Sequence, residues 1–164
     1  MIKPGMGKSW IIICLFFSIL LGGCFFDSKQ EHLSQMDFEE IKEIINLGLS
    51  KKEVKEVLGE PVGIAKENSL EGIPDNPEYW RYDFPINGYS FDADTPDGID
   101  IEGLQTGDMK MQLRLSWTSD FFSRKVASYS IFYKGNDGLV YWYYSDGTHS
   151  VYDSEKDEFI DVGK

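Results

Sequence analysis

Residues 37–61 constrain the fold of this chain most, because they carry start and stop signals for two short helices in succession. Asp37 with Glu40 three residues later fits a capping box, and Met36 is placed to pack as a hydrophobic staple against Ile41. Apolar residues then recur at helical spacing and end at a glycine, at Phe38, Ile41, Ile44, Ile45 and Gly48. This pattern predicts a first helix.

A second helix is predicted immediately afterwards. Ser50 with Glu53 fits another capping box. The apolar stripe and the stop signals come next, at Val54, Val57, Leu58, Gly59 and Pro61. Only Gly48 and Leu49 separate the two segments, so the sequence predicts an αα-hairpin. Helices of this length are marginal in water by themselves, and a sheet must therefore cover their apolar faces.

Alternating and aromatic-rich segments follow the helix pair and supply that sheet. Trp80, Tyr82 and Phe84 alternate with polar residues, as in a half-buried strand. Asp146-Gly147 between two aromatic-rich runs is typical of a two-residue hairpin turn. The predicted fold class is α+β, with an N-terminal αα-hairpin packed on one face of an antiparallel β-meander sheet. The expected strands are 62–65, 79–84, 110–117, 125–134, 139–144, 148–152 and 158–162.

The beginning of the chain has the pattern of a secretion signal. Lys3 and Lys8 precede an apolar run, residues 10–21, that is too short for a comfortable membrane span. The sequence Leu-Gly-Gly-Cys that ends at Cys24 resembles a bacterial lipobox, in which the cysteine is acylated, typically with palmitate among its chains, and becomes the new N-terminus. An ordinary signal peptide, or an uncleaved anchor with an incidental cysteine, is the alternative.

The lipobox divides the chain into three parts. We expect residues 1–23 to be a lipoprotein signal peptide, 24–36 to be the lipidated N-terminus and tether, and 37–164 to be one domain. The residue after Cys24 is Phe25 rather than Asp, so the signal that retains many lipoproteins in the inner membrane is missing. The expected location is the bacterial cell envelope, on the outer membrane facing the periplasm where the host has one.

The charge of the mature chain limits its partners. Two of the 16 basic residues lie in the signal peptide, which leaves 14 against 28 acidic residues, a net charge of −14. Such a field repels nucleic acid, and we expect no nucleic-acid partner. The charge serves either solubility or the recognition of a basic protein.

Part of the chain resembles a known family. Leu47-Gly48-Leu49-Ser50, then Leu58-Gly59-Glu60-Pro61, then Tyr79-Trp80-Arg81-Tyr82 are similar to segments of the SmpA/OmlA type of small outer-membrane lipoprotein. That family includes the smallest lipoprotein of the β-barrel assembly machinery. The resemblance implies a helix pair on a small antiparallel sheet, a fold also similar to secreted β-lactamase-inhibitor proteins. It implies a role in envelope or outer-membrane assembly, although fold alone does not fix function.

Enzymatic chemistry has little support in the sequence. Only His32 and His149 are present, no thiol remains after Cys24 is acylated, and no nucleophile, phosphate-loop or zinc-protease motif occurs. The acidic run after Phe91 has the wrong spacing for an EF-hand. Counted from Asp92, Pro96 falls at position 5, where a ligand belongs, and Gly98 falls at position 7 instead of position 6, where the turn glycine belongs. We therefore predict a non-enzymatic protein without metal or cofactor.

Two groups of residues are candidates for partner binding. The first is an acidic insertion, residues 85–108, which includes Asp92, Asp94, Asp97 and Asp100. Connections of this length are rare in compact domains unless they are functional or disordered. The second is a group of aromatic strand residues, Tyr129, Tyr133, Tyr141 and Trp142, which suit either an interface or cross-strand packing.

Two functions are therefore open at this stage. In the first, the chain is a lipid-anchored binding module for envelope assembly that uses the sheet face or the helix pair. In the second, it is an inhibitor or immunity-type lipoprotein that applies the acidic insertion to a basic protein. Phe121-Phe122 is expected to plug the core rather than contact a partner.

Overall fold

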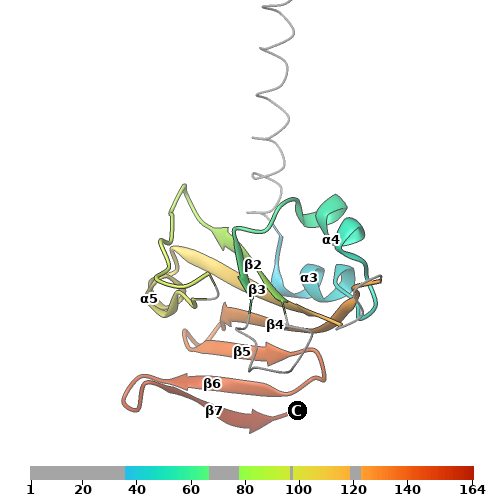
Figure 1. Cartoon of the computed structure of the whole chain (residues 1–164). Coiled ribbons are helices and arrows are strands. Elements are labelled where there is room, and N and C mark those ends of the chain that lie inside the picture. The colour runs from blue at the N-terminus through green and yellow to red at the C-terminus, as the bar shows by residue number, and fades with distance from the viewer. Residues whose placement is uncertain (1–35, 67–77, 97, 119–122) are drawn as a thin grey trace, which may run out of the picture. The chain divides into compact units, whose positions relative to one another are not determined.

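The computed structural model describes residues 36–66, 78–96, 98–118 and 123–164, and Met36–Lys164 forms one compact unit (Figure 1). The predictions for the signal peptide, Cys24, His32, Asp97 and Phe121-Phe122 lie outside these residues. The α+β class with an antiparallel sheet is confirmed. The helices are α3 (Phe38–Ile44), α4 (Lys51–Leu58) and α5 (Ile101–Thr106).

The sheet is a meander in which every strand pairs antiparallel with its sequence neighbour, in the order β1 to β7. Its seven strands are β1 (Gly63–Lys66), β2 (Glu78–Pro85), β3 (Met109–Trp117), β4 (Val126–Lys134), β5 (Val140–Tyr144), β6 (His149–Asp153) and β7 (Glu158–Gly163). The turn predicted at Asp146-Gly147 connects β5 and β6, with Gly147 at a positive φ of 89°.

The caps of the two N-terminal helices follow the sequence. The Asp37 side chain accepts a hydrogen bond from the Glu40 backbone N–H, and Ser50 and Glu53 form the complete capping box of α4. The first helix ends earlier than predicted, because the Asn46 side-chain amide donates to the carbonyls of Glu43 and Ile44. The chain is already extended at Ile45, with a φ of −88° and a ψ of 110°.

The connection between α3 and α4 is therefore longer than the two residues expected. Its backbone pairs with the beginning of β4: Gly48 N–H donates to the Val126 carbonyl, and Val126 N–H donates to the Leu49 carbonyl. Gly48 has a φ of 90°, so it bends this connection instead of ending the helix.

The strand register separates two faces of the sheet. The first face carries Trp80 and Tyr82 of β2, with Leu113, Ile131 and Tyr143 of the following strands, all of which are buried. The second face carries Arg81 of β2, Gln112 of β3, Phe132 of β4 and Trp142 of β5.

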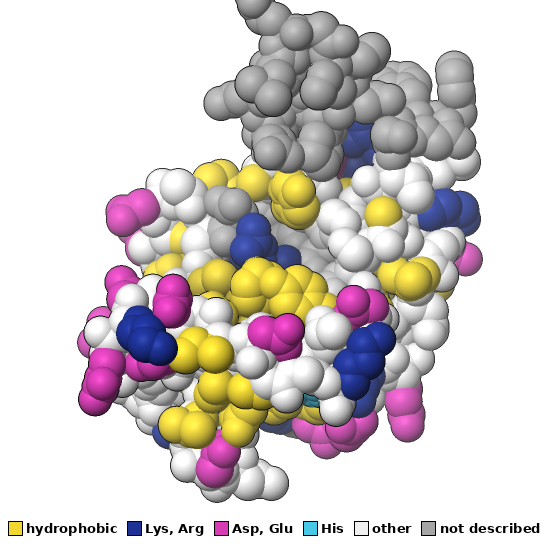
Figure 2. Space-filling model, turned by 90° about the horizontal axis from the view of Figure 1, so that it is seen from below, with side chains coloured by type: hydrophobic (Ala, Val, Ile, Leu, Met, Phe, Trp, Pro, Cys, Tyr) yellow, Lys and Arg dark blue, Asp and Glu magenta, His cyan; other side chains and the backbone are white. Residues whose placement is uncertain are grey.

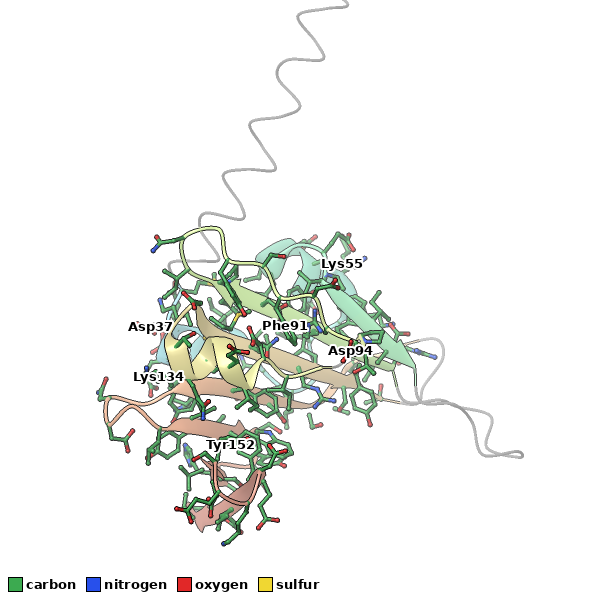
Figure 3. The ribbon with its side chains drawn as sticks, turned by 90° about the vertical axis from the view of Figure 1, so that its left-hand side faces the viewer. Asp37, Lys55, Phe91, Asp94, Lys134 and Tyr152 are labelled. Atoms are coloured by element: carbon green, nitrogen blue, oxygen red, sulfur yellow. The ribbon has the colours of Figure 1, made fainter. Side chains whose placement is uncertain are left out.

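A second apolar core lies on the second face and is built by the insertion. Its fully buried members are Leu104, Met109, Phe132 and Val140, and further side chains pack against them, namely Tyr89, Phe91, Ile99, Ile101, Trp142, Tyr152 and Phe159. The insertion is not a plain loop, because residues 101–106 form α5. Figure 3 shows the insertion and α5 in front of the sheet, with Lys134 beside α5, where its Nζ donates to the Gln105 carbonyl at 2.6 Å.

A buried polar network holds the insertion to the sheet. Gln112 Nε2 donates to Asp83 Oδ1 at 2.8 Å, and Gln112 Oε1 accepts from the Asp100 backbone N–H at 2.7 Å. Arg81 Nε lies 3.1 Å from Asp83 Oδ1, and Arg81 Nη1 donates to the carbonyls of Thr95 and Gly98. Burial raises the pKa of Asp83, against the opposing effects of Gln112 and Arg81.

Glu78 at the beginning of β2 is an ionic centre of the fold. It is only 8% exposed, and its carboxylate accepts hydrogen bonds from Lys51 Nζ, Trp80 Nε1 and Arg124 Nη1 at 2.6, 2.5 and 2.8 Å. Burial acts to raise the pKa of Glu78, but the hydrogen bonds and the two positive charges outweigh it and lower the pKa below its ordinary value of 4.5. Ionised Glu78 therefore stabilises the fold.

Replacing Glu78 with Gln is expected to lower the free energy of unfolding at neutral pH by about 1–3 kcal/mol, because buried donors lose an ionised acceptor. A lowered pKa makes this contribution complete above pH 4.5 and removes it as pH falls through the folded-state value. Urea unfolding measured from pH 7 to pH 3 should therefore show the difference between the proteins shrinking on acidification. The matched control is Glu60→Gln, which removes the exposed pair with Lys55 and should cost below about 1 kcal/mol. Equal losses from both variants would contradict the assignment.

Candidate functional site

The predicted acidic residues do not form one cluster. Asp92 and Asp94 are exposed, whereas Asp100 is only 3% exposed. Asp100 caps α5 instead: its side chain accepts from the Gly103 backbone N–H at 2.8 Å, and a Cβ at position 103 would lie 2.1 Å from its Oδ2. Its assignment as a surface contact was wrong, because the carboxylate is needed to start a helix.

The predicted aromatic residues are divided between the two faces. Tyr129, Tyr133 and Tyr141 belong to the first face, and Trp142 belongs to the second. Tyr129 is 8% exposed, and burial raises its pKa to about 12. Tyr133 stacks on Phe38 with ring centroids 4.2 Å apart, and burial raises its pKa as well. Tyr129 and Trp142 nevertheless line the same groove, described below, whereas Tyr133 and Tyr141 do not line it.

Tyr141 also has a local role. Its hydroxyl donates to Asp137 Oδ2 at 2.6 Å, which raises the pKa of the tyrosine and lowers the pKa of the aspartate. This bond closes the turn between β4 and β5.

An open groove lies on the second face, beyond the part that the insertion covers. Its volume is about 330 Å³, and it spans strands β2 to β5. The residues that line it are Tyr79, Arg114, Leu115, Ser116, Ser128, Tyr129, Ser130, Trp142 and Tyr144. Across the strands, Arg114 pairs with Arg81, where the insertion begins to cover the sheet. The groove is thus the uncovered remainder of the second face.

Serine side chains create the floor of the groove. Ser116 and Ser128 are cross-strand partners whose hydroxyl oxygens lie 2.6 Å apart, and Ser130 follows on the same face of β4. These small residues leave space between larger neighbours. Serines at alternate strand positions were the sequence signal for this floor. The same pattern is equally typical of a strand face exposed to solvent.

Aromatic rings form one wall of the groove. Trp142 lies 4.2 Å from Tyr144 between ring centroids, and it rests on Phe132 and Phe159 at 5.1 and 5.4 Å. On the other side, the guanidinium of Arg114 lies over the Tyr79 ring at 5.9 Å. Trp142 is therefore held in place by its packing against the second core.

A positive charge, that of Arg114, lines the groove itself. Burial raises the pKa of Tyr144, with Arg114 acting against the shift and Asp146 and Asp161 adding to it. Figure 2 shows hydrophobic side chains gathered across the underside of the molecule, with both acidic and basic side chains around them.

Other predicted site features are placed as follows. His149 contacts the Tyr143 ring at 4.9 Å between centroids. Within the described ranges, no three His, Cys, Asp or Glu side chains lie close enough together to hold a metal ion. The helices described here are all too short or too polar to span a membrane.

Comparison with known proteins identifies no relative: no family model, curated protein or solved structure matches this chain. The resemblance to the SmpA/OmlA lipoproteins therefore stays a prediction from sequence.

Proposed function

We propose that this chain is a lipid-anchored, non-enzymatic binding module of the bacterial cell envelope. The lipobox that ends at Cys24 supports the anchor, since a diacylglycerol with an amide-linked chain exceeds what stable membrane attachment requires. The similarity to SmpA/OmlA lipoproteins supports an outer-membrane location facing the periplasm.

We also infer that α3 and α4 form one helical layer over the first face, as in that family. Three contacts support this arrangement. Phe38 of α3 packs on Tyr133, Lys51 of α4 pairs with Glu78, and the Tyr82 hydroxyl donates to the Gly59 carbonyl at 3.2 Å. The helix pair then covers the first face and stabilises the fold. The second face is left for recognition.

A basic protein partner is the ligand proposed for the insertion. The observation that carries this proposal is that Asp92 and Asp94 are exposed on a segment fixed to the sheet. Phe91 lies 5.3 Å from the Arg81 guanidinium, and any side chain at Gly63 would collide with the Pro96 carbonyl. Figure 3 shows Phe91 and Asp94 on this segment. Fixed carboxylates speed association with a positive surface at little entropic cost.

The test begins with capture of the partner by the acylated full chain from detergent-solubilised membranes. Association kinetics are then measured for the double variant Asp92→Asn with Asp94→Asn. We expect the association rate constant to fall by about threefold to tenfold at low salt, and the difference to shrink at high salt. The matched control is Glu43→Gln with Glu155→Gln, which removes the same charge from exposed sites away from the insertion.

Identical association of the double variant and the parent would remove Asp92 and Asp94 from recognition. Deleting the insertion is not a useful alternative, because it would uncover Phe132 and the rest of the second core. An inhibitor or immunity-type role makes the same charge prediction, and it is favoured if the captured partner is a hydrolase or a toxin.

A further inference from the structure

The strand pairing places Ser130 between two large polar side chains in the groove. Ser130 on β4 is the cross-strand partner of Arg114 on β3 and of Tyr144 on β5, so the three residues form one row across the second face. Adjacent strands lie about 4.8 Å apart, and the backbones of Arg114 and Tyr144 are therefore separated by about 10 Å. The serine side chain is too short to fill the space between them. All three residues line the groove, which thus has a gap above Ser130.

The Arg114 end of this row is positively charged. Among the described residues that line the groove, Arg114 alone carries a charge. Its cross-strand partner on β2 is Arg81, so two guanidinium groups occupy neighbouring positions on the same face. Like charges in such positions repel each other, and Asp83 beside Arg81 offsets part of this repulsion. An anion bound beside Arg114 would weaken the repulsion further, whatever else the Arg114 guanidinium contacts.

Hydroxyl groups supply further donors along the row. Ser130 has a hydroxyl at the floor, and Tyr144 has one at the far end. Burial raises the pKa of Tyr144, so its phenol stays protonated at neutral pH, and Arg114 is close enough to oppose the shift. Asp146 and Asp161 add to the shift, and these two carboxylates would repel an anion from the Tyr144 end. An anion in the row therefore lies nearer Arg114, whose planar fork of N–H donors suits two oxygens of one group.

We propose that the groove binds a small organic molecule through an oxyanion, either a carboxylate or a phosphate, held above Ser130 by the Arg114 guanidinium and by hydroxyl groups. A volume of about 330 Å³ is at the lower end for small-molecule sites, so the groove has room for an organic group beside the oxyanion. It lies on internal strands, so a peptide strand cannot extend the sheet here. This site goes beyond the proposed protein recognition and uses a different surface.

The test titrates the acylated full chain, in a non-ionic detergent, with phenylacetate, with phenyl phosphate and with the neutral phenylacetamide. At about 0.1 M salt the Debye length is about 10 Å, so the distant carboxylates of this acidic chain hardly repel an anion beside Arg114. Calorimetry gives the affinity. The thermal unfolding midpoint is the second readout, since a ligand that binds only the folded state raises it.

We expect at least one of the two anions to bind about tenfold or more tightly than phenylacetamide, because hydrogen bonds to an ionised acceptor are stronger than those to a neutral one. The same anion should raise the unfolding midpoint, and the tighter of the two identifies the preferred oxyanion.

Three variants place the anion in the groove. Arg114→Gln removes the charge and should weaken binding by about tenfold or more. Arg114→Lys keeps the charge without the planar fork, and it should recover part of the affinity. Ser130→Leu fills the gap and should abolish binding. The matched control is Lys52→Gln, which removes the same charge from a side chain that is 86% exposed on α4 and should bind as the parent does.

Four results would overturn the proposal. The first is that neither anion binds the folded parent, and the second is that phenylacetamide binds as tightly as both anions. The third is that Arg114→Gln and Ser130→Leu, both folded by circular dichroism, bind the anions as the parent does. The fourth is an equal loss of affinity in Arg114→Gln and Lys52→Gln. Replacing Asp92 and Asp94 with Asn should not weaken anion binding, so this proposal and that for the protein partner fail independently.

Discussion

Replacing Phe132 with Ala is expected to lower the free energy of unfolding by about 3–5 kcal/mol, the usual cost of truncating a buried phenylalanine. Phe132 is fully buried at the centre of the second core. Its ring stacks on Trp142 at 5.1 Å and meets Phe159 edge-on at 5.8 Å. Its removal leaves a cavity between the sheet and the insertion, since the surrounding strands are hydrogen-bonded and cannot close it.

Urea unfolding followed by far-ultraviolet circular dichroism measures this effect. The matched control is Val162→Ala, because Val162 is 56% exposed on β7 and its truncation should change stability by no more than about 0.5 kcal/mol. A loss below about 1 kcal/mol for Phe132→Ala would mean that the insertion does not pack on the sheet in solution.

Replacing Cys24 with Ala is expected to release the protein from the membrane or to mislocalise it, because acylation is lost. Each buried methylene of an acyl chain contributes about 0.8 kcal/mol to membrane binding, so three chains exceed any contribution from the protein surface. The acidic chain, with 28 Asp and Glu, would be repelled by anionic headgroups once the lipid is lost. Cell fractionation and mass spectrometry of the N-terminus measure the outcome.

Cys14→Ala is the matched control for lipidation. Cys14 lies in the segment expected to be removed, so this variant should be acylated and anchored as the parent is. An unmodified Cys24 in the parent, or an N-terminus that still carries Trp10, would contradict the lipoprotein assignment.

Local signals predicted the elements whose ends are set by neighbouring residues. The capping box of Ser50 and Glu53 and the turn at Asp146-Gly147 are of this kind, since both depend on hydrogen bonds or φ angles within a few residues. The early end of α3 has a local cause, since the Asn46 side-chain amide donates to the carbonyls of Glu43 and Ile44. The pairing of the following connection with Val126, far along the chain, is what no local pattern predicts.

The sequence of the insertion contains local signals for the helix α5. Asp100 before the segment and Gly107 after it are the expected caps of a short helix, and Ile101 and Leu104 have helical spacing. The acidic character of the aspartates predicts one surface, whereas Asp100 is a buried cap and Asp92 is exposed. Charge counts alone do not distinguish a capping carboxylate from a solvated one.

The distribution of the candidate aromatic residues depends on the tertiary structure. Alternation in a strand assigns residues to two faces, as it does for Tyr141 and Trp142, but it does not say what covers each face. The uncovered groove exists because the insertion reaches Arg81 and stops before Arg114, which is a property of the tertiary structure.

The strictly sequential order of the strands has a consequence for the folding route. Neighbouring strands from β3 to β7 meet through short connections, so their pairing needs little loop closure. Strand β2 reaches β3 only after residues 86–108 have formed a closed loop, and each doubling of loop length adds about 0.6 kcal/mol to that cost. We therefore expect the β3–β4–β5 hairpins to form first and β2 to join later, with α5 and the second core closing over Phe132 in the same step.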